Sequence, residues 1–211
     1  AAALAAEPPT FDVERGVVEA PFTLTLGAEA GHTIWVSRDG GAPDVAYTGP
    51  MDVDQSTIVR ALSQSADGAV SETATYTYLL LDDVMAQPVL DTRFTQDPVL
   101  GPRMADSLLA LPTISLVLDG SLSQTEQPVS FEYTEPGGLS LQEDCGVARV
   151  GGHSVINYPK TNLRLYFRAA YGAGRLHADF FEDTDPTGAP PLDEHDSLDL
   201  RGGAHDSVFY L

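Results

Sequence analysis

The amino-acid sequence predicts a mainly β protein, built from an N-terminal β-sandwich and a second, small antiparallel sheet. Three observations point to this fold class. Short segments alternate apolar and polar residues with period two, which places one face of each strand in a core. Glycine, proline and aspartate separate these segments, as turn residues do. Between Phe11 and Leu81 no helical period persists over about eleven residues.

The N-terminal part of the sequence is expected to form the sandwich. Residues 1–10 are interpreted as a tail, because Ala1 to Ala6 lack the basic start and the full apolar core of an export signal. Residues 11–81 then hold about seven short strands, a number typical of a small β-sandwich. The strands are clearest at 22–26, 34–37, 57–62 and 73–80, with a tight turn at Asp39-Gly40-Gly41.

A proline-rich linker, residues 82–104, is expected after the sandwich. Pro88, Pro98 and Pro102 and the lack of periodicity predict an ordered segment with little regular structure. One or two helical turns are expected over residues 105–111.

The remaining chain, residues 105–211, is expected to form the second sheet. Its strands are predicted at 113–118, 129–133, 139–150, 162–168 and 197–201, with a proline- and acid-rich loop at 182–196. In the fourth of these strands Leu163, Leu165 and Phe167 alternate with Arg164, Tyr166 and Arg168. This spacing predicts one buried face and one basic, solvated face.

The composition limits the classes of partner. The formal net charge is −20, from 31 acidic and 11 basic side chains. Nucleic acid and anionic membranes are therefore excluded as partners, because both require clustered cations. No run of about 18 apolar residues predicts a membrane span. The acidity favours solubility, with Ca²⁺ binding by carboxylates as the alternative.

A candidate phosphate site lies ahead of the fourth strand. Gly151, Gly152 and Ser154 form a glycine-rich turn, Lys160 is the only lysine of the sequence, and Arg164 follows in the strand. Backbone N–H groups of such a turn, together with a lysine, can hold a phosphate. The alternative is structural: the glycines only permit a positive φ in a hairpin, and Lys160 is a solvated side chain.

Other catalytic and metal-binding patterns are weak. The single cysteine, Cys145, excludes an intrachain disulfide and a multi-cysteine zinc site, and a buried, inert thiol is expected. The histidines lack metal-ligand spacing, so no metal site is predicted. No G-x-S-x-G turn supports a hydrolase. Trp35 or Tyr47 would stack on a sugar ring if exposed, although core packing is the alternative.

An ordered series of motifs in residues 11–81 carries a family resemblance. Gly31-His32-Thr33-Ile34, Arg38-Asp39-Gly40-Gly41-Ala42-Pro43, Tyr47-Thr48-Gly49-Pro50, Ile58-Val59-Arg60-Ala61 and the closing Tyr78 make up this series. It resembles the immunoglobulin-like module found at the C-terminal side of chitobiases and in many secreted bacterial glycosidases. The resemblance implies an immunoglobulin/fibronectin-III-like sandwich that acts as a spacer or accessory domain and carries no catalytic residues.

A second resemblance covers residues 105–211. The Gly151-Gly152 turn, Lys160, Arg164-Leu165-Tyr166-Phe167 and Asp196-Ser197-Leu198-Asp199-Leu200-Arg201 are similar to motifs at the start of the spore-coat protein H-like (CotH) kinases. That family is an atypical protein kinase, so the resemblance implies part of a kinase-like N-lobe, with Lys160 on the phosphates of ATP and Mg²⁺ as the second cofactor.

This chain departs from the CotH pattern at several positions. Val150 and Val155 replace a histidine and an arginine beside the glycine turn, and His205-Asp206 stand for asparagine-aspartate. The family places its magnesium ligands and catalytic base beyond the position that corresponds to Leu211. No complete catalytic set is therefore expected within these residues.

Together these observations predict a secreted or cell-surface bacterial protein with an accessory role, binding a polysaccharide or a cell-surface protein and not catalytic as this chain alone. Two alternatives remain. One is a fragment of an ATP-dependent extracellular protein kinase with Lys160 at the nucleotide, and the other is a structural spacer of a cell-surface protein.

Overall fold

The computed structural model describes residues 6–88, 90–152, 160–180 and 192–202 and confirms a mainly β protein with several sheets. The chain divides into two compact units. The first unit comprises Ala1–Val117 and Glu132–Gln142, and the second comprises Leu118–Phe131 and Glu143–Leu211.

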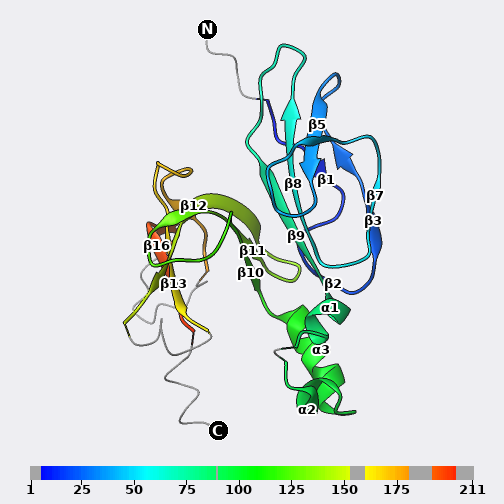
Figure 1. The fold of residues 1–211 in the computed structure, drawn as a ribbon, viewed down its shortest axis with the longest axis vertical. Coiled ribbons are helices and arrows are strands. Elements are labelled where there is room, and N and C mark those ends of the chain that lie inside the picture. Colours follow the sequence, from blue (N-terminus) through cyan, green and yellow to red (C-terminus); the bar gives the residue numbers. More distant parts are fainter. Residues whose placement is uncertain (1–5, 89, 153–159, 181–191, 203–211) are drawn as a thin grey trace. The chain divides into compact units, whose positions relative to one another are not determined.

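The first unit contains one five-stranded sheet and two smaller strand pairs (Figure 1). The strands of the large sheet run in the order β2-β9-β8-β5-β6, and β1 pairs with β4 and β3 with β7. Their bounds are β1 Thr10–Phe11, β2 Gly16–Val18, β3 Phe22–Leu24, β4 Leu26–Gly27, β5 Thr33–Ser37, β6 Val45–Ala46, β7 Met51–Val53, β8 Thr57–Gln64 and β9 Ala74–Leu80. The expected strands at 34–37, 57–62 and 73–80 are thereby confirmed, and the one at 22–26 is split into β3 and β4.

Period-two alternation produces the core of the first unit. In β8, Val59 and Ala61 are fully buried, whereas their neighbours Arg60 and Leu62 are half-buried on the other face. The core cluster contains Leu24, Leu26, Ile34, Val36, Val53, Val59, Ala61, Tyr78 and Leu80. Tyr78 is also anchored at its polar end, because its hydroxyl donates a hydrogen bond to the Val13 carbonyl oxygen at 2.8 Å.

Two expectations for the first unit need correction. The segment 1–10 is more than a tail in its described part, since Pro9 is buried and Thr10 pairs with Gly27. The segment 82–104 is not a linker with little regular structure. It contains the helices α1 Leu81–Met85 and α2 Thr92–Thr95 and the start of α3 Leu100–Ala110.

The prolines and acids of this segment explain the helices. Pro102 lies in the first turn of α3, where its missing N–H has no intrahelical partner to lose. Asp97 accepts hydrogen bonds from the free N–H groups of Val99 and Leu100, both at 2.8 Å. Asp91 caps α2 by accepting from the Arg93 N–H. Proline therefore marks a helix start here rather than an irregular chain.

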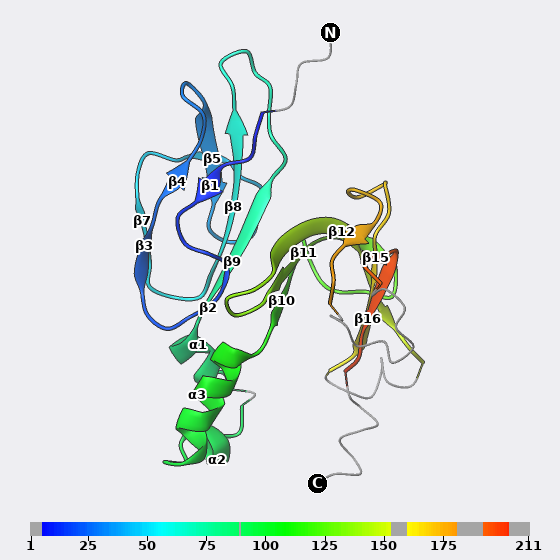
Figure 2. The same ribbon diagram turned by 180° about the vertical axis from the view of Figure 1, so that it is seen from behind.

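The second unit holds the C-terminal strands of a five-stranded sheet with the order β10-β11-β12-β13-β16 (Figure 2). The bounds are β10 Thr113–Val117, β11 Gln127–Thr134, β12 Ser140–Val150, β13 Asn162–Tyr166 and β16 Ser197–Leu200. β13 is antiparallel to both β12 and β16, as expected. Strands β11 and β12 each continue from the second unit into the first, so residues 132–142 belong to the first unit.

The predicted alternation in residues 162–168 is confirmed. Leu165 and Phe167 are buried, and Phe167 contacts Phe131 edge-to-face with ring centroids 5.8 Å apart. A short pair, β14 Leu176–His177 with β15 Glu194–His195, was not predicted. It corrects the expected loop at 182–196 over the described residues of that range.

Among the residues that the structure describes, no helix combines the length and the hydrophobicity needed to cross a bilayer.

Candidate functional site

The structure places part of the predicted phosphate site at the connection between β12 and β13. Val150 at the end of β12 pairs with Asn162 at the start of β13, so Gly151, Gly152 and Lys160 flank this connection at one end of the sheet. Lys160 is exposed. Gly151 has φ of 114°, a left-handed conformation that explains a glycine there without any ligand. The fourth turn residue, Ser154, lies outside the described residues.

Arg164 belongs to the strand face rather than to this turn. Its Nε and Nη2 donate to the two carboxylate oxygens of Asp199 on the neighbouring strand, at 2.5 and 2.7 Å. This bidentate hydrogen bonding raises the pKa of Arg164 and lowers the pKa of Asp199. Arg168 is paired similarly with Glu126 at 3.1 Å. The predicted basic face therefore carries acids that balance these two charges.

Two other side chains that could be reactive, Cys145 and His195, are buried within the fold. Cys145 is fully buried, and burial raises its pKa to about 12, as expected of an inert thiol. His195 is buried, with Nε2 2.9 Å from the Ala178 carbonyl oxygen and its ring near Phe180. Within the described ranges no three His, Cys, Asp or Glu side chains come together as metal ligands would.

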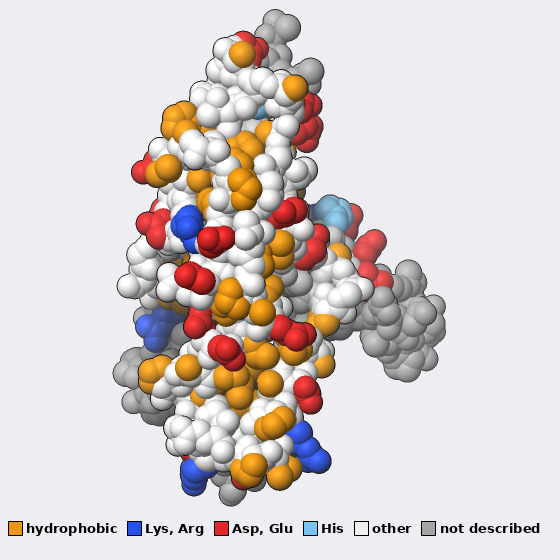
Figure 3. Space-filling model, turned by 90° about the vertical axis from the view of Figure 1, so that its right-hand side faces the viewer, with side chains coloured by type: hydrophobic (Ala, Val, Ile, Leu, Met, Phe, Trp, Pro, Cys, Tyr) orange, Lys and Arg blue, Asp and Glu red, His pale blue; other side chains and the backbone are white. Residues whose placement is uncertain are grey.

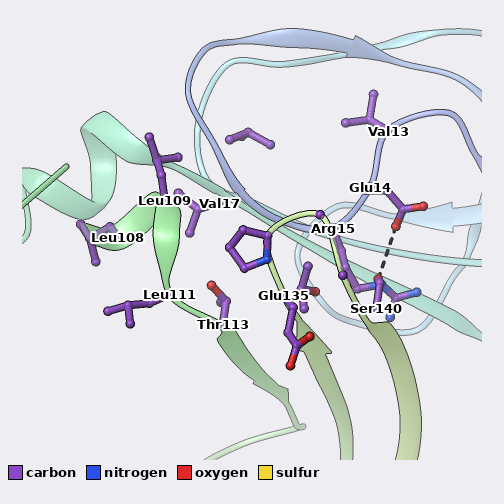
Figure 4. Close-up of a pocket in the computed structure, with 15 residues that line it drawn as sticks. Val13, Glu14, Arg15, Val17, Leu108, Leu109, Leu111, Thr113, Glu135 and Ser140 are labelled. Carbon is purple, nitrogen blue, oxygen red and sulfur yellow. Dashed lines mark hydrogen bonds between the residues drawn. The ribbon is translucent and has the colours of Figure 1, made fainter. Parts of the chain in front are cut away.

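A cavity of about 500 Å³ lies within the first unit (Figure 4). Helix α3 and the residues after it supply Leu108, Leu109 and Leu111 to one wall, next to Val17 of β2. The opposite wall is polar and comes from the segment before β2 and from the 132–142 hairpin. It includes Glu14, Arg15, Glu135 and Ser140.

A buried glutamate fixes the hairpin that forms the polar wall. Glu132, only 2% exposed, accepts hydrogen bonds from the backbone N–H of Thr77 at 3.0 Å and from the Thr77 hydroxyl. Gln142, at the other end of the hairpin, accepts from the Thr75 N–H at 2.8 Å. Both contacts use β9, so the two ends of the hairpin are held to the same strand of the five-stranded sheet of the first unit.

Arg15 lies beside this glutamate, with its side chain 9% exposed. Its Nη1 is 3.5 Å from Glu132 Oε1, and its guanidinium carbon is 3.9 Å from the centroid of the Tyr76 ring. Desolvation raises the pKa of Glu132, while the Thr77 hydrogen bonds and Arg15 oppose the rise. The positive charge of Arg15 is thus directed at Glu132 and Tyr76.

The two acids that line the cavity, Glu14 and Glu135, can accept further hydrogen bonds. Glu14 is exposed and accepts one hydrogen bond, from the Ser140 hydroxyl at 3.3 Å. Glu135 accepts from the Tyr133 hydroxyl at 2.6 Å and from the Leu139 N–H at 3.4 Å. Each carboxylate offers about four lone-pair positions, so both can bind a further donor at the cavity.

A second cavity of the first unit, of about 690 Å³, lies between residues 36–39 and 44–52. Half-buried Tyr47 lines it, and the Tyr47 hydroxyl accepts from the Leu26 N–H at 3.0 Å. Trp35 is also half-buried and donates from Nε1 to Gln64 Oε1 at 3.1 Å. Both aromatics named as sugar platforms are therefore tied to neighbouring groups at their polar ends.

Sequence reasoning missed the first cavity because its walls come from three distant segments. Residues 13–18, 108–113 and 134–140 show no common motif. The sequence gives no sign that Glu132 is buried, because Ser130 and Glu132 alternate with Val129, Phe131 and Tyr133, and this period-two pattern predicts a solvated face for the two polar residues. Its partners, Thr77 and Arg15, carry no signal either.

Comparison of the chain with models of protein families, with curated proteins and with solved structures finds no match in any of the three.

Proposed function

We propose that this chain is an accessory, partner-binding part of a secreted or cell-surface bacterial protein of the CotH-like kinase type. In this proposal residues 11–81 are the immunoglobulin/fibronectin-III-like sandwich, and the second sheet is the start of a kinase-like N-lobe. The chain contributes recognition rather than phosphoryl transfer. The observation that carries the proposal is the cavity of the first unit, which combines an apolar wall with two carboxylates that can accept further hydrogen bonds.

The pairing of Arg164 supports the accessory role over nucleotide binding. A phosphate ligand at the glycine turn would need cations with free donors. Arg164 already directs two of its nitrogens at Asp199 and lies on the strand, two positions beyond Asn162. Lys160 then remains as the one predicted cation at the described part of this turn.

Nucleotide binding is the second candidate function, favoured by one observation. Gly151 and Lys160 flank the same strand connection, as a lysine that contacts a phosphate turn requires. Calorimetric titration with ATP and Mg²⁺, with Lys160→Ala as the control, separates the two functions. The accessory role predicts no binding heat for either protein. Saturable binding heat for the wild-type protein that is absent for Lys160→Ala would instead support the nucleotide-binding alternative.

Polymer binding is tested separately with the full chain. Sedimentation with chitin, cellulose and peptidoglycan measures whether a polysaccharide is the partner. Retention on one of these polymers identifies the accessory ligand as carbohydrate. Loss from all three leaves a protein partner or a spacer, which the peptide experiment below distinguishes.

A further inference from the structure

We infer that the cavity of the first unit binds an extended peptide segment of a partner protein, in which an aliphatic side chain is flanked by lysine or arginine. The inference rests on the proposed accessory function and names its ligand class. It follows from the lining chemistry, the charge and the strand edges at this cavity.

The lining favours an aliphatic group. The apolar wall consists of leucine and valine, among them Leu109, Leu111 and Val17 (Figure 4). None of the fifteen described residues that line the cavity is aromatic. Aromatic faces are what a sugar ring or a nucleobase would stack on. Leu111 is 58% exposed, so part of the apolar wall is open to a partner's side chain.

The charge at the cavity favours a basic partner. Glu14 and Glu135 face it with free acceptor capacity, whereas the charge of Arg15 is opposed by Glu132 at 3.5 Å. The whole chain carries a net charge of −20. On the face in Figure 3, acidic side chains are interspersed with hydrophobic ones, and lysine and arginine are few. An anionic ligand would meet repulsion here, and a cationic one would be steered towards the site.

The strand edges favour a peptide backbone over another aliphatic cation. β2 lies at one end of the order β2-β9-β8-β5-β6, and its Val17 and Val18 line the cavity. β10 is likewise the first strand of its sheet, and Thr113 lines the cavity at its start. Edge strands present backbone N–H and C=O groups that an extended peptide can pair with. We place the peptide backbone along the outer edge of β2.

The test uses the full chain and a fluorescein-labelled peptide, Ser-Thr-Lys-Leu-Val-Lys-Thr-Ser, in fluorescence anisotropy. Two control peptides replace both lysines by glutamate, or leucine and valine by serine. We expect saturable binding of the first peptide, weaker binding of both controls, and weakening by added NaCl because the contacts between charges are exposed. Absence of binding, or equal binding of the glutamate peptide, would overturn the inference.

Matched variants locate the site. Leu111→Ser is compared with Val99→Ser, since Leu111 and Val99 are 58% and 59% exposed but only Leu111 lines the cavity. Glu14→Gln is compared with Glu19→Gln, an exposed acid outside the lining. We expect Leu111→Ser to raise Kd about tenfold and Val99→Ser to leave it unchanged. Glu14→Gln should weaken binding more than Glu19→Gln does.

Equal effects within either pair would place the peptide elsewhere and overturn the assignment. Thermal unfolding of each variant checks that the first unit remains folded. The outcome is independent of the ATP titration. A chain that binds neither ATP nor the peptide but sediments with a polysaccharide would keep the accessory function and lose this inference.

Discussion

Glu132 is an ionisable side chain buried within a strand, at 2% exposure. It is tolerated because Thr77 supplies two donors and Arg15 supplies a countercharge. Removing one partner of such a cluster leaves the other buried without compensation, which costs about 3–5 kcal/mol. Glu132 therefore holds the 132–142 hairpin to β9 at a free-energy cost that depends on the protonation of its carboxyl group.

The first prediction concerns the pH dependence that Glu132 confers. Burial raises its pKa in the folded state above the 4.5 of the free side chain. The folded protein thus binds this proton more tightly than the unfolded chain does. Protonation of Glu132 therefore adds to the free energy of unfolding, fully below about pH 4.5, and this contribution declines as pH rises through the folded-state pKa. Urea unfolding of wild type and Glu132→Gln between about pH 4 and about pH 8 measures this contribution.

We expect the free energy of unfolding of wild type, minus that of Glu132→Gln, to fall with rising pH. Glu132→Gln also removes the negative charge beside Arg15. This adds a constant to the free-energy difference at every pH and leaves the sign of its dependence on pH unchanged. A difference that rises with pH would show that Arg15 and Thr77 outweigh desolvation in setting the pKa.

The second prediction concerns Cys145. Its thiol is buried and its pKa is raised to about 12, first by desolvation and then by Asp144 and Glu143. Only the thiolate reacts with iodoacetamide, so labelling of the folded protein should be far slower than labelling in urea. Mass spectrometry of timed samples measures both rates. Equal rates in the two conditions would mean that the second unit opens readily around this residue.

Helices α2 and α3 approach closely at a single glycine. A methyl group added to Gly101 would lie 2.6 Å from the carbonyl oxygen of Thr95, a backbone atom that cannot turn away. At Gly152, in contrast, an added methyl group would meet no atom within 4 Å. Replacing either glycine by alanine adds the same methyl group, so the two substitutions differ in the space around that group.

The third prediction is that Gly101→Ala destabilises the first unit although alanine favours helices. The gain in helix propensity is about 1 kcal/mol, whereas overpacking costs about 1–3 kcal/mol and also displaces α2. Urea unfolding with Gly152→Ala as the control compares the two substitutions. If Gly101→Ala were as stable as wild type, the two helices would have room to separate.

The elements that the sequence predicts well are those with a sustained local period. β8 buries every second residue, and most of β5 and β9 follows the same alternation, which is visible without tertiary information. In β13, Leu165 is buried between the exposed Arg164 and the half-buried Tyr166. The start of α3 was missed because Pro102 was interpreted as a breaker, although proline is compatible with a first turn. β14 and β15 are too short for any period.

The two candidate sites, the glycine turn and the cavity of the first unit, also differ in how well the sequence predicts them. The glycine turn and Lys160 were identified because they are close in sequence. The cavity depends on contacts such as Glu132 with Thr77, which are separated by 55 residues. No local pattern encodes such a contact.

At the scale of the whole molecule, the dominant property is the net charge of −20. Like charges at this density repel one another and favour the expanded, unfolded chain. Exposed ion pairs such as Arg164 with Asp199 offset little of this repulsion, because solvent screens them.

The fourth prediction is that NaCl raises the melting temperature at pH 7. Salt shortens the Debye length from about 30 Å at 0.01 M to about 10 Å at 0.1 M and so weakens the repulsion. Each kcal/mol of repulsion removed should raise Tm by about 2–4 °C. Differential scanning calorimetry over this salt range measures the effect. A falling Tm would indicate that attractive charge pairs outweigh the repulsion.

The passage of β11 and β12 through both units makes the first unit discontinuous along the polypeptide. Transplanting residues 1–117 into another protein would leave behind Glu132, Gln142 and the part of the polar wall that Glu135 and Ser140 supply. A recombination event that transfers the complete polar wall to another gene must therefore have its breakpoint outside residues 118–142. The same topology makes a protease nick at 118–131 a sensitive assay of whether the two pieces stay associated.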